Sequence, residues 1–473
     1  MYFNSFEFFI FFLGTLFAYW YFFQRTITSR NLFILAASYL FYAYWDWRFL
    51  SLIVVSSAID FVAAKQMSGR AKNERKPWLV LSLFTNLGIL FTFKYFDFFA
   101  ESAKAVLSGL GMEASFTTLN VVLPVGISFY TFQTLSYTID VYRGKLAHEK
   151  DPIAFFAYVS FFPQLVAGPI ERAGRMLPQF KEIHSFNPTM AVKALRQILW
   201  GLFKKVAIAD QVADIVNHSY AGYSSAPASV LWLGAFYFAI EIYCDFSGYS
   251  DIAIGSARLM GFRLSENFRY PYFARSFREF WRRWHISLST WFRDYVYIPL
   301  GGSRKGTLRA VFSLLLTFLL SGLWHGANWT FVAWGGLNGL YLIPGMLLRR
   351  KAKTRALSTS KGTFLNSVGA VILVFVVTML TWVFFRSESL SQAVEYLQNM
   401  FLSDWVIPPY RKLSPLYWIA ILFAMEWFMS KTEKPFNLPD TWHPILRWTL
   451  YLVVCLSIAR FFTIYHTFIY FQF

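Results

Sequence analysis

Two histidines stand where ionisable side chains are costly to place. His325 lies in an apolar, aromatic run, SGLWHGANW at residues 321–329, between two long hydrophobic segments. His285 lies in the sequence FWRRWHIS at residues 280–287, and the chain contains only seven histidines. An ionisable residue at membrane depth marks a functional site by default, because hydrocarbon penalises its charged form. This pair is therefore the first candidate for chemistry.

His325 is a candidate general base. A neutral imidazole can take a proton from a hydroxyl or thiol and return it later, and burial in an apolar site favours that neutral form. The alternative is a structural histidine whose ring nitrogens are satisfied by neighbouring backbone. Gly322 and Gly326 count against it, because small residues let another backbone or a ligand approach closely. On a helix Asn328 would share a face with His325 and could orient the imidazole or bind a substrate carbonyl.

His285 allows several roles. It could hold an acyl donor, polarise a carbonyl group or orient His325, and the alternative is an interfacial histidine on a tryptophan-rich helix. A metal bound by the two histidines would need a further ligand. Although Asp245, Asp251 and Asp294 are present, no closely spaced ligand motif supports such a site, so no metal is predicted.

The stretch from residue 267 to 305 interleaves arginines with aromatic residues and is too charged for a lipid-facing span. At helical spacing Glu279 can pair with Arg283. The pattern suits an amphipathic helix at the membrane interface or along a polar cavity, and a surface helix for anionic lipid head groups is the simpler alternative. The residues expected to line such a cavity are Trp281, Arg282, Arg283 and Trp284, with Trp324 of the later apolar run.

Other polar side chains could belong to the same cavity. Glu241 and Asp245 lie one helical turn apart and could form ion pairs with the arginines of residues 269–293. This favours a structural role over a catalytic one. Gln164 and Glu171 are further candidates for the cavity lining. The chain has no GxSxG motif, P-loop or dinucleotide fingerprint, so hydrolase, NTPase and dehydrogenase functions have no support.

The composition indicates an integral membrane protein. Of the 473 residues 56% are hydrophobic and 15% are charged, whereas ordinary soluble domains carry about 25% charged residues. The net charge of +18 arises mainly in short loops, so the positive-inside rule explains it without a nucleic-acid partner. Cys244 and Cys455 lie in apolar runs and predict no disulfide framework.

Hydropathy predicts 11–13 transmembrane or re-entrant helices, since a span needs about 20 apolar residues. The candidate segments are 6–23, 31–45, 49–66, 78–99, 118–139, 152–168, 192–216, 229–258, 309–323, 328–348, 365–385, 414–429 and 445–463. Pro124, Gly126, Pro163 and Gly168 interrupt two of them, 118–139 and 152–168. Irregular backbone at membrane depth requires a protein-lined or wet cavity, so these two are the expected re-entrant or buried segments.

The first segment is predicted to be a retained transmembrane helix with its N-terminus outside. It has Glu7 and no basic residue before it, whereas Arg25 and Arg30 follow it. Basic residues gather on the cytoplasmic side of a membrane span. No small-residue cleavage pattern of a signal peptide is present.

The order of the motifs resembles that of the membrane-bound O-acyltransferase family, in particular its bacterial alginate O-acetylase-like branch. The resemblance runs nearly from end to end, and it is carried by WH at residues 284–285, WHG at 324–326, LPVGISFYTFQ at 123–133, AGPIER at 167–172, DFSGYSD at 245–251 and YIPLGG at 297–302. It implies a ring of tilted helices around a central funnel or tunnel. It also implies that His325 lies at the narrowest point and that His285 occupies the second catalytic-type position.

The resemblance further implies a cytoplasmic acyl thioester as donor, such as acetyl-CoA, and no permanently bound cofactor. The acyl group would pass to a periplasmic or extracellular partner protein and on to a polysaccharide of the alginate, cellulose or peptidoglycan type. The basic stretch at 269–293 could attract the donor's phosphates. The membrane would shield the thioester from water until the acceptor hydroxyl arrives.

We therefore expect one integral membrane acyltransferase domain over residues 1–473, in contact with membrane lipids and placed in a bacterial inner membrane. Within it we expect N-terminal helices at 1–115, a catalytic core at about 118–348 and C-terminal helices at 362–473. One alternative function is D-alanyl transfer to teichoic acid from a carrier protein. Another is a non-enzymatic transporter or scaffold of a polysaccharide-export complex, because intramembrane ionisable residues also mark transport paths.

Overall fold

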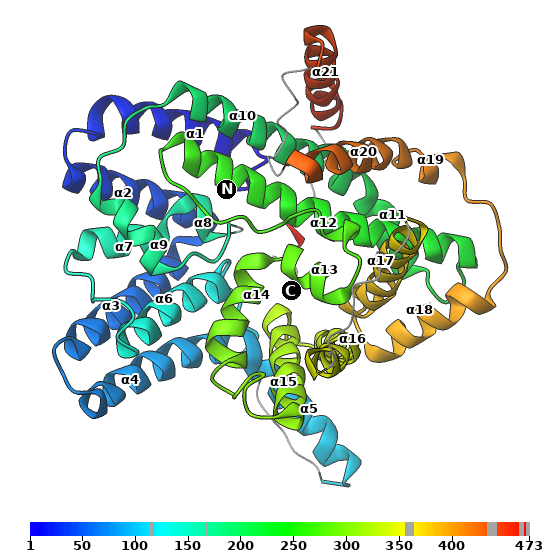
Figure 1. Ribbon diagram of the computed structural model, residues 1–473, viewed down its shortest axis with the longest axis horizontal. Helices are drawn as coiled ribbons and strands as arrows, with labels where there is room; N and C mark the ends of the chain where they lie inside the picture. The colour runs from blue at the N-terminus through cyan, green and yellow to red at the C-terminus, as the bar shows by residue number, and fades with distance from the viewer. Residues whose placement is uncertain (113–117, 167, 355–363, 433–441, 463–467, 470–473) are drawn as a thin grey trace. The chain divides into compact units, whose positions relative to one another are not determined.

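The computed structural model describes residues 1–112, 118–166, 168–354, 364–432, 442–462 and 468–469 (Figure 1). Within these ranges the regular secondary structure is helical throughout. The all-α prediction is therefore confirmed. The predicted boundaries at 115 and 362 lie outside the described residues, and the single-domain organisation stays a prediction.

Eight helical stretches of the described chain are long and apolar enough to cross a membrane, which confirms a multi-pass membrane protein. They are Phe6–Phe23, Ile27–Met67, Lys72–Gly109, Ala228–Leu259, Thr307–His325, Trp329–Leu348, Val368–Arg386 and Pro444–Phe461. The apolar helix Leu416–Ser430 is shorter. Of the other predicted segments, 118–139 and 152–168 are interrupted, whereas 192–216 is helical throughout and contains a π-helical turn at Phe203–Ala209.

The chain divides into two compact units, Met1–Leu195 with Ala253–Ser265, and Arg196–Ile252 with Glu266–Phe473. Two helices, α10 (Pro188–Leu202) and α12 (Ala228–Leu259), contain residues of both units. The first unit otherwise contains α1 (Phe6–Ala18), η1 (Tyr19–Phe23), α2 (Ile27–Asp46), η2 (Trp47–Phe49), α3 (Leu50–Met67), α4 (Lys72–Leu90), η3 (Phe91–Tyr95), α5 (Phe96–Gly109), α6 (Ile127–Tyr142), α7 (Pro152–Ser160), α8 (Phe162–Leu165), α9 (Ala173–Met176) and η4 (Leu177–Lys181).

A buried polar network joins α3, α4 and α6, which pack side by side in the first unit. Asp60 of α3 accepts hydrogen bonds from Asn86 of α4 at 2.9 Å and from Thr138 of α6 at 2.9 Å, and Ser82 of α4 donates to it as well. Between helices in a membrane, polar side chains find few other partners. This network therefore fixes how the three helices meet.

The two segments that Pro and Gly interrupt are indeed broken. Gly126, with φ 76°, precedes α6, so the helix starts at Ile127 and not near residue 118. A side chain at Gly126 would lie 2.8 Å from the carbonyl oxygen of Leu165, so only glycine permits this approach. The segment 152–168 breaks at Phe161 between α7 and α8. That these breaks border a wet cavity stays a prediction.

The second unit otherwise contains η5 (Phe203–Ala209), α11 (Asp210–Ala221), η6 (Pro271–Phe273), α13 (Phe277–Arg283), α14 (Ile286–Phe292), η7 (Arg293–Tyr297), α15 (Thr307–His325), α16 (Trp329–Thr354), α17 (Phe364–Arg386), α18 (Leu390–Leu402), α19 (Tyr410–Leu413), α20 (Leu416–Thr432) and α21 (Pro444–Phe461). Its most extensive helix–helix packing is the antiparallel hairpin of α15 and α16.

Glycines set the close packing of this hairpin. A Cβ atom at Gly322 of α15 would lie 2.1 Å from the carbonyl oxygen of Phe331, and one at Gly335 of α16 would lie 2.2 Å from that of Phe318. The two backbones therefore meet where both helices lack side chains. In turn α16 packs on α17 and α13, which brings the segments that carry His285 and His325 together.

Candidate active site

His325 is the last residue of α15 and lies against aromatic walls. Its side chain is almost fully buried, at 3% exposure. The ring centre lies 5.0 Å from that of Trp334 on α16, 5.4 Å from Phe385 on α17 and 4.9 Å from its neighbour Trp324. Gly326 leaves the helix in an extended conformation, so the imidazole stands at a helix end inside an apolar cage.

His285 lies at a sharp break between α13 and α14. The amphipathic pattern predicts one helix here, but Trp284 is extended and His285 adopts a left-handed backbone with φ 40° and ψ 56°. A non-glycine residue in this region costs roughly 1–2 kcal/mol, and such strain is concentrated at functional sites. The break is therefore a difference from the predicted helix, at a position that carries an imidazole.

Asn267 fixes the orientation of the His285 ring. Its Oδ1 accepts hydrogen bonds from the backbone N–H of Ser287 at 3.3 Å and from the Ser287 hydroxyl at 2.9 Å, and it lies 3.0 Å from Nδ1 of His285. Because an amide oxygen only accepts, Nδ1 must carry the ring proton and donate it. Nε2 is then the acceptor nitrogen of the ring.

Burial lowers the pKa of His285 to about 3, so the ring is neutral at physiological pH. Asn267 itself was not predicted as a site residue. It lies 18 positions before His285, a separation that no helical or strand period relates. The one available signal was its position at the start of a polar stretch within an apolar chain.

The two imidazoles come together in the second unit. Their ring centres are 6.4 Å apart, with planes inclined at 61°, and Trp324 lies within 6.0 Å of His285. His285 is 1% exposed, and the ring of Phe246 meets it edge-on at 4.6 Å. The neutral His285 ring offers one acceptor nitrogen, Nε2, to a hydrogen-bond donor. Among the described residues no three His, Cys, Asp or Glu side chains group closely enough to hold a metal ion.

The predicted tryptophans form part of the same aromatic cage. Trp284 is fully buried, stacks on Phe280 at 5.5 Å and lies 5.0 Å from Trp382. Trp281 is half-buried, with Phe318 5.1 Å away. Sequence reasoning did not identify Trp334, Trp382 and Phe385, since each lies in an ordinary apolar span. A tunnel through this cage stays a prediction.

Asn328 does not share a helix face with His325, contrary to the prediction. The helix ends at His325, and Asn328 instead caps α16: its Oδ1 accepts the backbone N–H of Thr330 at 3.0 Å, and its amide donates to the carbonyl of Glu388 at 2.8 Å. The glycines beside His325 also have a structural partner. Phe331 of α16 fills the space next to both Gly322 and Gly326.

The two predicted arginines differ in their surroundings. Arg283 pairs with Glu279 at 2.5 Å, as the helical spacing predicts. Arg282 is exposed. The two neighbouring cations therefore face different environments, one bound by a carboxylate and one accessible to solvent or to a ligand.

Two carboxylates of α12, Asp245 and Asp251, pair with lysines rather than with the predicted arginines. Lys204 and Lys205 both lie on η5. The Lys205 Nζ is 2.8 Å from a carboxylate oxygen of Asp245 and 2.7 Å from one of Asp210. The Lys204 Nζ is 2.6 Å from a carboxylate oxygen of Asp251. Asp245 also accepts the backbone N–H of Ile469 at 2.7 Å. The signal for this cluster was two adjacent lysines within the apolar segment 192–216, because buried cations need anionic partners.

Gln164 and Glu171 belong to the first unit. Gln164 donates to the carbonyl of Tyr158 at 2.6 Å. Glu171 accepts hydrogen bonds from the backbone and the hydroxyl of Ser265, and burial raises the pKa of its carboxyl group. Their predicted place in a tunnel lining stays a prediction.

The sequence of this chain is similar to those of membrane acyltransferases. A family model described as the membrane-bound O-acyltransferase family matches residues 143–386, a range that contains both histidines. The chain is 39% identical to a probable alginate O-acetylase of Azotobacter vinelandii over 84% of this chain and 78% of that protein. It is 36% identical to a peptidoglycan O-acetyltransferase of Helicobacter pylori over 78% of this chain and 73% of that protein. A teichoic acid D-alanyltransferase of Streptococcus thermophilus is 29% identical over 49% of this chain and 58% of that protein.

Proposed function

The chain belongs to the membrane-bound O-acyltransferase family, and from that premise we propose that it transfers an acetyl group from a thioester donor to hydroxyl groups of an exported or cell-wall polysaccharide. The relatives named for O-acetylation of alginate and of peptidoglycan support acetate as the acyl group. The observation that carries the proposal is the buried imidazole pair, with ring centres 6.4 Å apart in an aromatic cage.

In the proposed reaction His325 is the general base. It takes the proton of the acceptor hydroxyl while the hydroxyl oxygen attacks the thioester carbonyl. The new C–O bond forms, the C–S bond breaks, and the proton held by His325 passes to the leaving thiolate. Each transfer requires the imidazole to lie within hydrogen-bond reach of the reacting group, and such acid–base help contributes about 10²–10⁴ in rate.

His285 is proposed as a positioning partner. Because its Nδ1–H is donated to Asn267, its Nε2 can only accept a hydrogen bond and cannot polarise a carbonyl as a donor would. A ring whose pKa is about 3 is also a weak base. We therefore propose that His285 accepts a hydrogen bond from the incoming hydroxyl or from His325. Polarising a carbonyl group, the role that needs a donor, is less compatible with this ring.

The donor is proposed to be acetyl-CoA, which would approach from the cytoplasm. The exposed Arg282 is available to its phosphates, because arginine binds phosphate through several N–H donors at once. The acceptor would approach from the other face, where a periplasmic partner protein would take the acetyl group and pass it to the glycan. We accordingly propose that the chain lies in a bacterial inner membrane, and the basic residues after the first helix support an N-terminus on the outside.

The test is the ester-linked acetate on cell-envelope and exported glycans, measured by mass spectrometry. Cells would carry the wild-type chain, His325→Ala or His218→Ala at matched membrane abundance. His218 is an exposed histidine and controls for loss of an imidazole as such. We expect acetate to disappear with His325→Ala and to persist with His218→Ala, and the acetylated glycan would identify the acceptor. Unchanged acetate in His325→Ala cells would overturn the proposal.

The relative named for D-alanyl transfer supports a second candidate, in which a carrier protein donates D-alanine to teichoic acid. The same mass spectra separate the two functions, because acetyl and D-alanyl esters differ in mass. Loss of D-alanyl ester in His325→Ala cells, with acetate unchanged, would favour this second function.

A further inference from the structure

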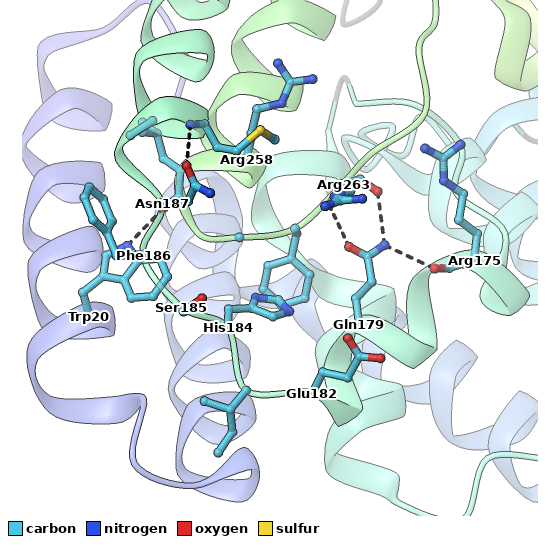
Figure 2. Close-up of a pocket in the computed structure, with 16 residues that line it drawn as sticks. Trp20, Arg175, Gln179, Glu182, His184, Ser185, Phe186, Asn187, Arg258 and Arg263 are labelled. Carbon is cyan, nitrogen blue, oxygen red and sulfur yellow. Dashed lines mark hydrogen bonds between the residues drawn. The ribbon is translucent and has the colours of Figure 1, made fainter.

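A pocket of about 650 Å³ in the first unit lies where two membrane spans end (Figure 2). Trp20 belongs to the span Phe6–Phe23, and Arg258 belongs to the last turn of the span Ala228–Leu259. The indole N–H of Trp20 donates to the carbonyl oxygen of Leu259 at 3.0 Å and ties these two ends together. The pocket therefore stands at the level where apolar spans give way to polar loops.

The charge of the pocket is positive. Arg175, Arg258 and Arg263 line it, against the single carboxylate of Glu182. The side chain of Gln179 holds the loop that carries Arg263. Its Oε1 accepts the backbone N–H of Arg263 at 2.7 Å, and its Nε2 donates to the backbone carbonyl of Arg263 at 3.1 Å. The guanidinium of Arg175 donates to the hydroxyl of Ser265 at 2.8 Å. The Arg175 guanidinium and the backbone of Arg263 are thus held in place, and an arginine presents several N–H donors at once, which suits a phosphate group.

His184 shapes the pocket but adds no charge. Its Nδ1 lies 3.1 Å from the carbonyl oxygen of Met260, and burial lowers the pKa of the ring. Gly261, with φ 87°, makes this contact possible, since a side chain there would lie 2.7 Å from Nδ1. The positive charge thus rests on arginines, which stay protonated at any physiological pH.

Apolar side chains at the pocket favour a lipid over a soluble anion. Ile183 and Phe186 line it and are 55% and 56% exposed. Trp20, at the end of a span, is at the depth where tryptophan side chains meet lipid head groups. A soluble phosphate would make use of the arginines alone, whereas a phospholipid would also cover these exposed apolar surfaces with its glycerol and acyl groups.

We propose that this pocket binds the phosphate group of an anionic phospholipid, with Arg258 and Arg263 as its principal charged contacts. Basic pockets between transmembrane helices are known to select anionic head groups, and each arginine near an anionic membrane surface strengthens binding about fivefold. The site is separate from the histidine pair in sequence and does not depend on the proposed acetyl transfer.

The test uses the purified full-length chain in detergent, with mass spectrometry of the intact protein–lipid complex. Dioleoylphosphatidylglycerol and dioleoylphosphatidylcholine are added at equal concentrations. We expect one phosphatidylglycerol to be retained in preference, and the double variant Arg258→Gln, Arg263→Gln to bind it about 25-fold more weakly. Arg263→Gln alone, at an exposed position, keeps the test valid if the double variant does not fold. It should weaken binding about fivefold.

Arg25→Gln is the matched control. Arg25 is an exposed arginine that follows the same first span but does not line the pocket, so its loss should leave retention unchanged. Equal losses for Arg25→Gln and Arg263→Gln would indicate diffuse attraction and overturn the proposal. Displacement of the lipid by millimolar inorganic phosphate or glycerol 3-phosphate would assign the pocket to a soluble anion and would also overturn it. Equal retention of phosphatidylglycerol and phosphatidylcholine would also overturn the proposal.

Discussion

The protonation state of His285 has a measurable consequence for stability. Its pKa in the folded chain is about 3, below the ordinary value of about 6.5 that an unfolded chain would show. As the pH falls below about 6.5 the unfolded chain binds a proton that the folded chain does not, so this residue makes the fold less stable. This loss of stability begins near pH 6.5 and grows progressively towards pH 3.

We therefore expect the thermal unfolding midpoint in detergent to fall between pH 7 and pH 5 by less in His285→Asn than in the wild type. Asparagine tolerates the left-handed backbone that His285 adopts, so the substitution does not add strain. Groups elsewhere titrate equally in both proteins and cancel in the comparison. An equal fall in both would contradict the neutral, buried state of His285.

Asn267 gives a second prediction at this scale. Removal of its amide in Asn267→Ala should lower kcat by about tenfold to a hundredfold and leave KM for the thioester nearly unchanged, because an incorrectly oriented His285 no longer positions the hydroxyl or His325 for proton transfer. Ser287→Ala is the control, since the Ser287 hydroxyl donates to the same amide oxygen. Asn267→Asp keeps an acceptor oxygen and should recover part of the activity. Equal losses in Asn267→Ala and Ser287→Ala would point to local packing alone.

The α15–α16 hairpin leads to a prediction at the scale of an element. Gly335→Ala places a Cβ atom 2.2 Å from a carbonyl oxygen of α15, so the helices must separate, at a cost of about 1–3 kcal/mol. Gly345→Ala, in the same helix, meets no atom within 4 Å. It should be neutral or stabilising by up to about 1 kcal/mol, because alanine favours helix.

Unfolding midpoints of the two alanine variants in detergent provide the measurement. Because both substitutions are of one type in one helix, a difference between them isolates the close contact. Comparable midpoints for Gly335→Ala and Gly345→Ala would show that α15 and α16 do not meet at this distance in the folded protein.

The elements differ in how far sequence alone could specify them. The long apolar spans were predictable because length and hydropathy determine them, and the breaks near Gly126 and Pro163 follow from the backbone preferences of these residues. The π-helical turn η5 and the left-handed turn at His285 have no periodic signature. They depend on contacts with distant residues, such as Asp245 for the first and Asn267 for the second.

For the whole molecule, the motifs were sufficient to indicate the family and the two histidines, and the comparisons confirm the family. The partners of these histidines could not be predicted, since Asn267, Trp334 and Phe385 reach them through tertiary packing. The predicted ring of helices and its central tunnel remain predictions.

Sealed vesicles that contain the purified chain test the proposed separation of donor and acceptor. Cysteine-free protein with one engineered cysteine after Arg25 would report which face carries the first loop. We expect transfer from acetyl-CoA only in the population whose first loop faces the donor, because a soluble, highly charged thioester cannot cross the bilayer. Equal transfer with the donor on either side would contradict the proposed orientation.

The lysine–aspartate cluster also constrains how the protein is made. A lysine in the centre of an inserting helix costs about 2.5–3.5 kcal/mol, and Lys204 and Lys205 are adjacent in one apolar segment. Lys205 has one carboxylate partner nearby in the chain, Asp210, but its second partner, Asp245, is synthesised 40 residues later. We expect the segment that carries the lysines to remain accessible to a membrane-impermeant amine reagent in nascent chains that stop at residue 240. In chains extended beyond Asp251 both amines should become protected, as the two segments enter the bilayer together.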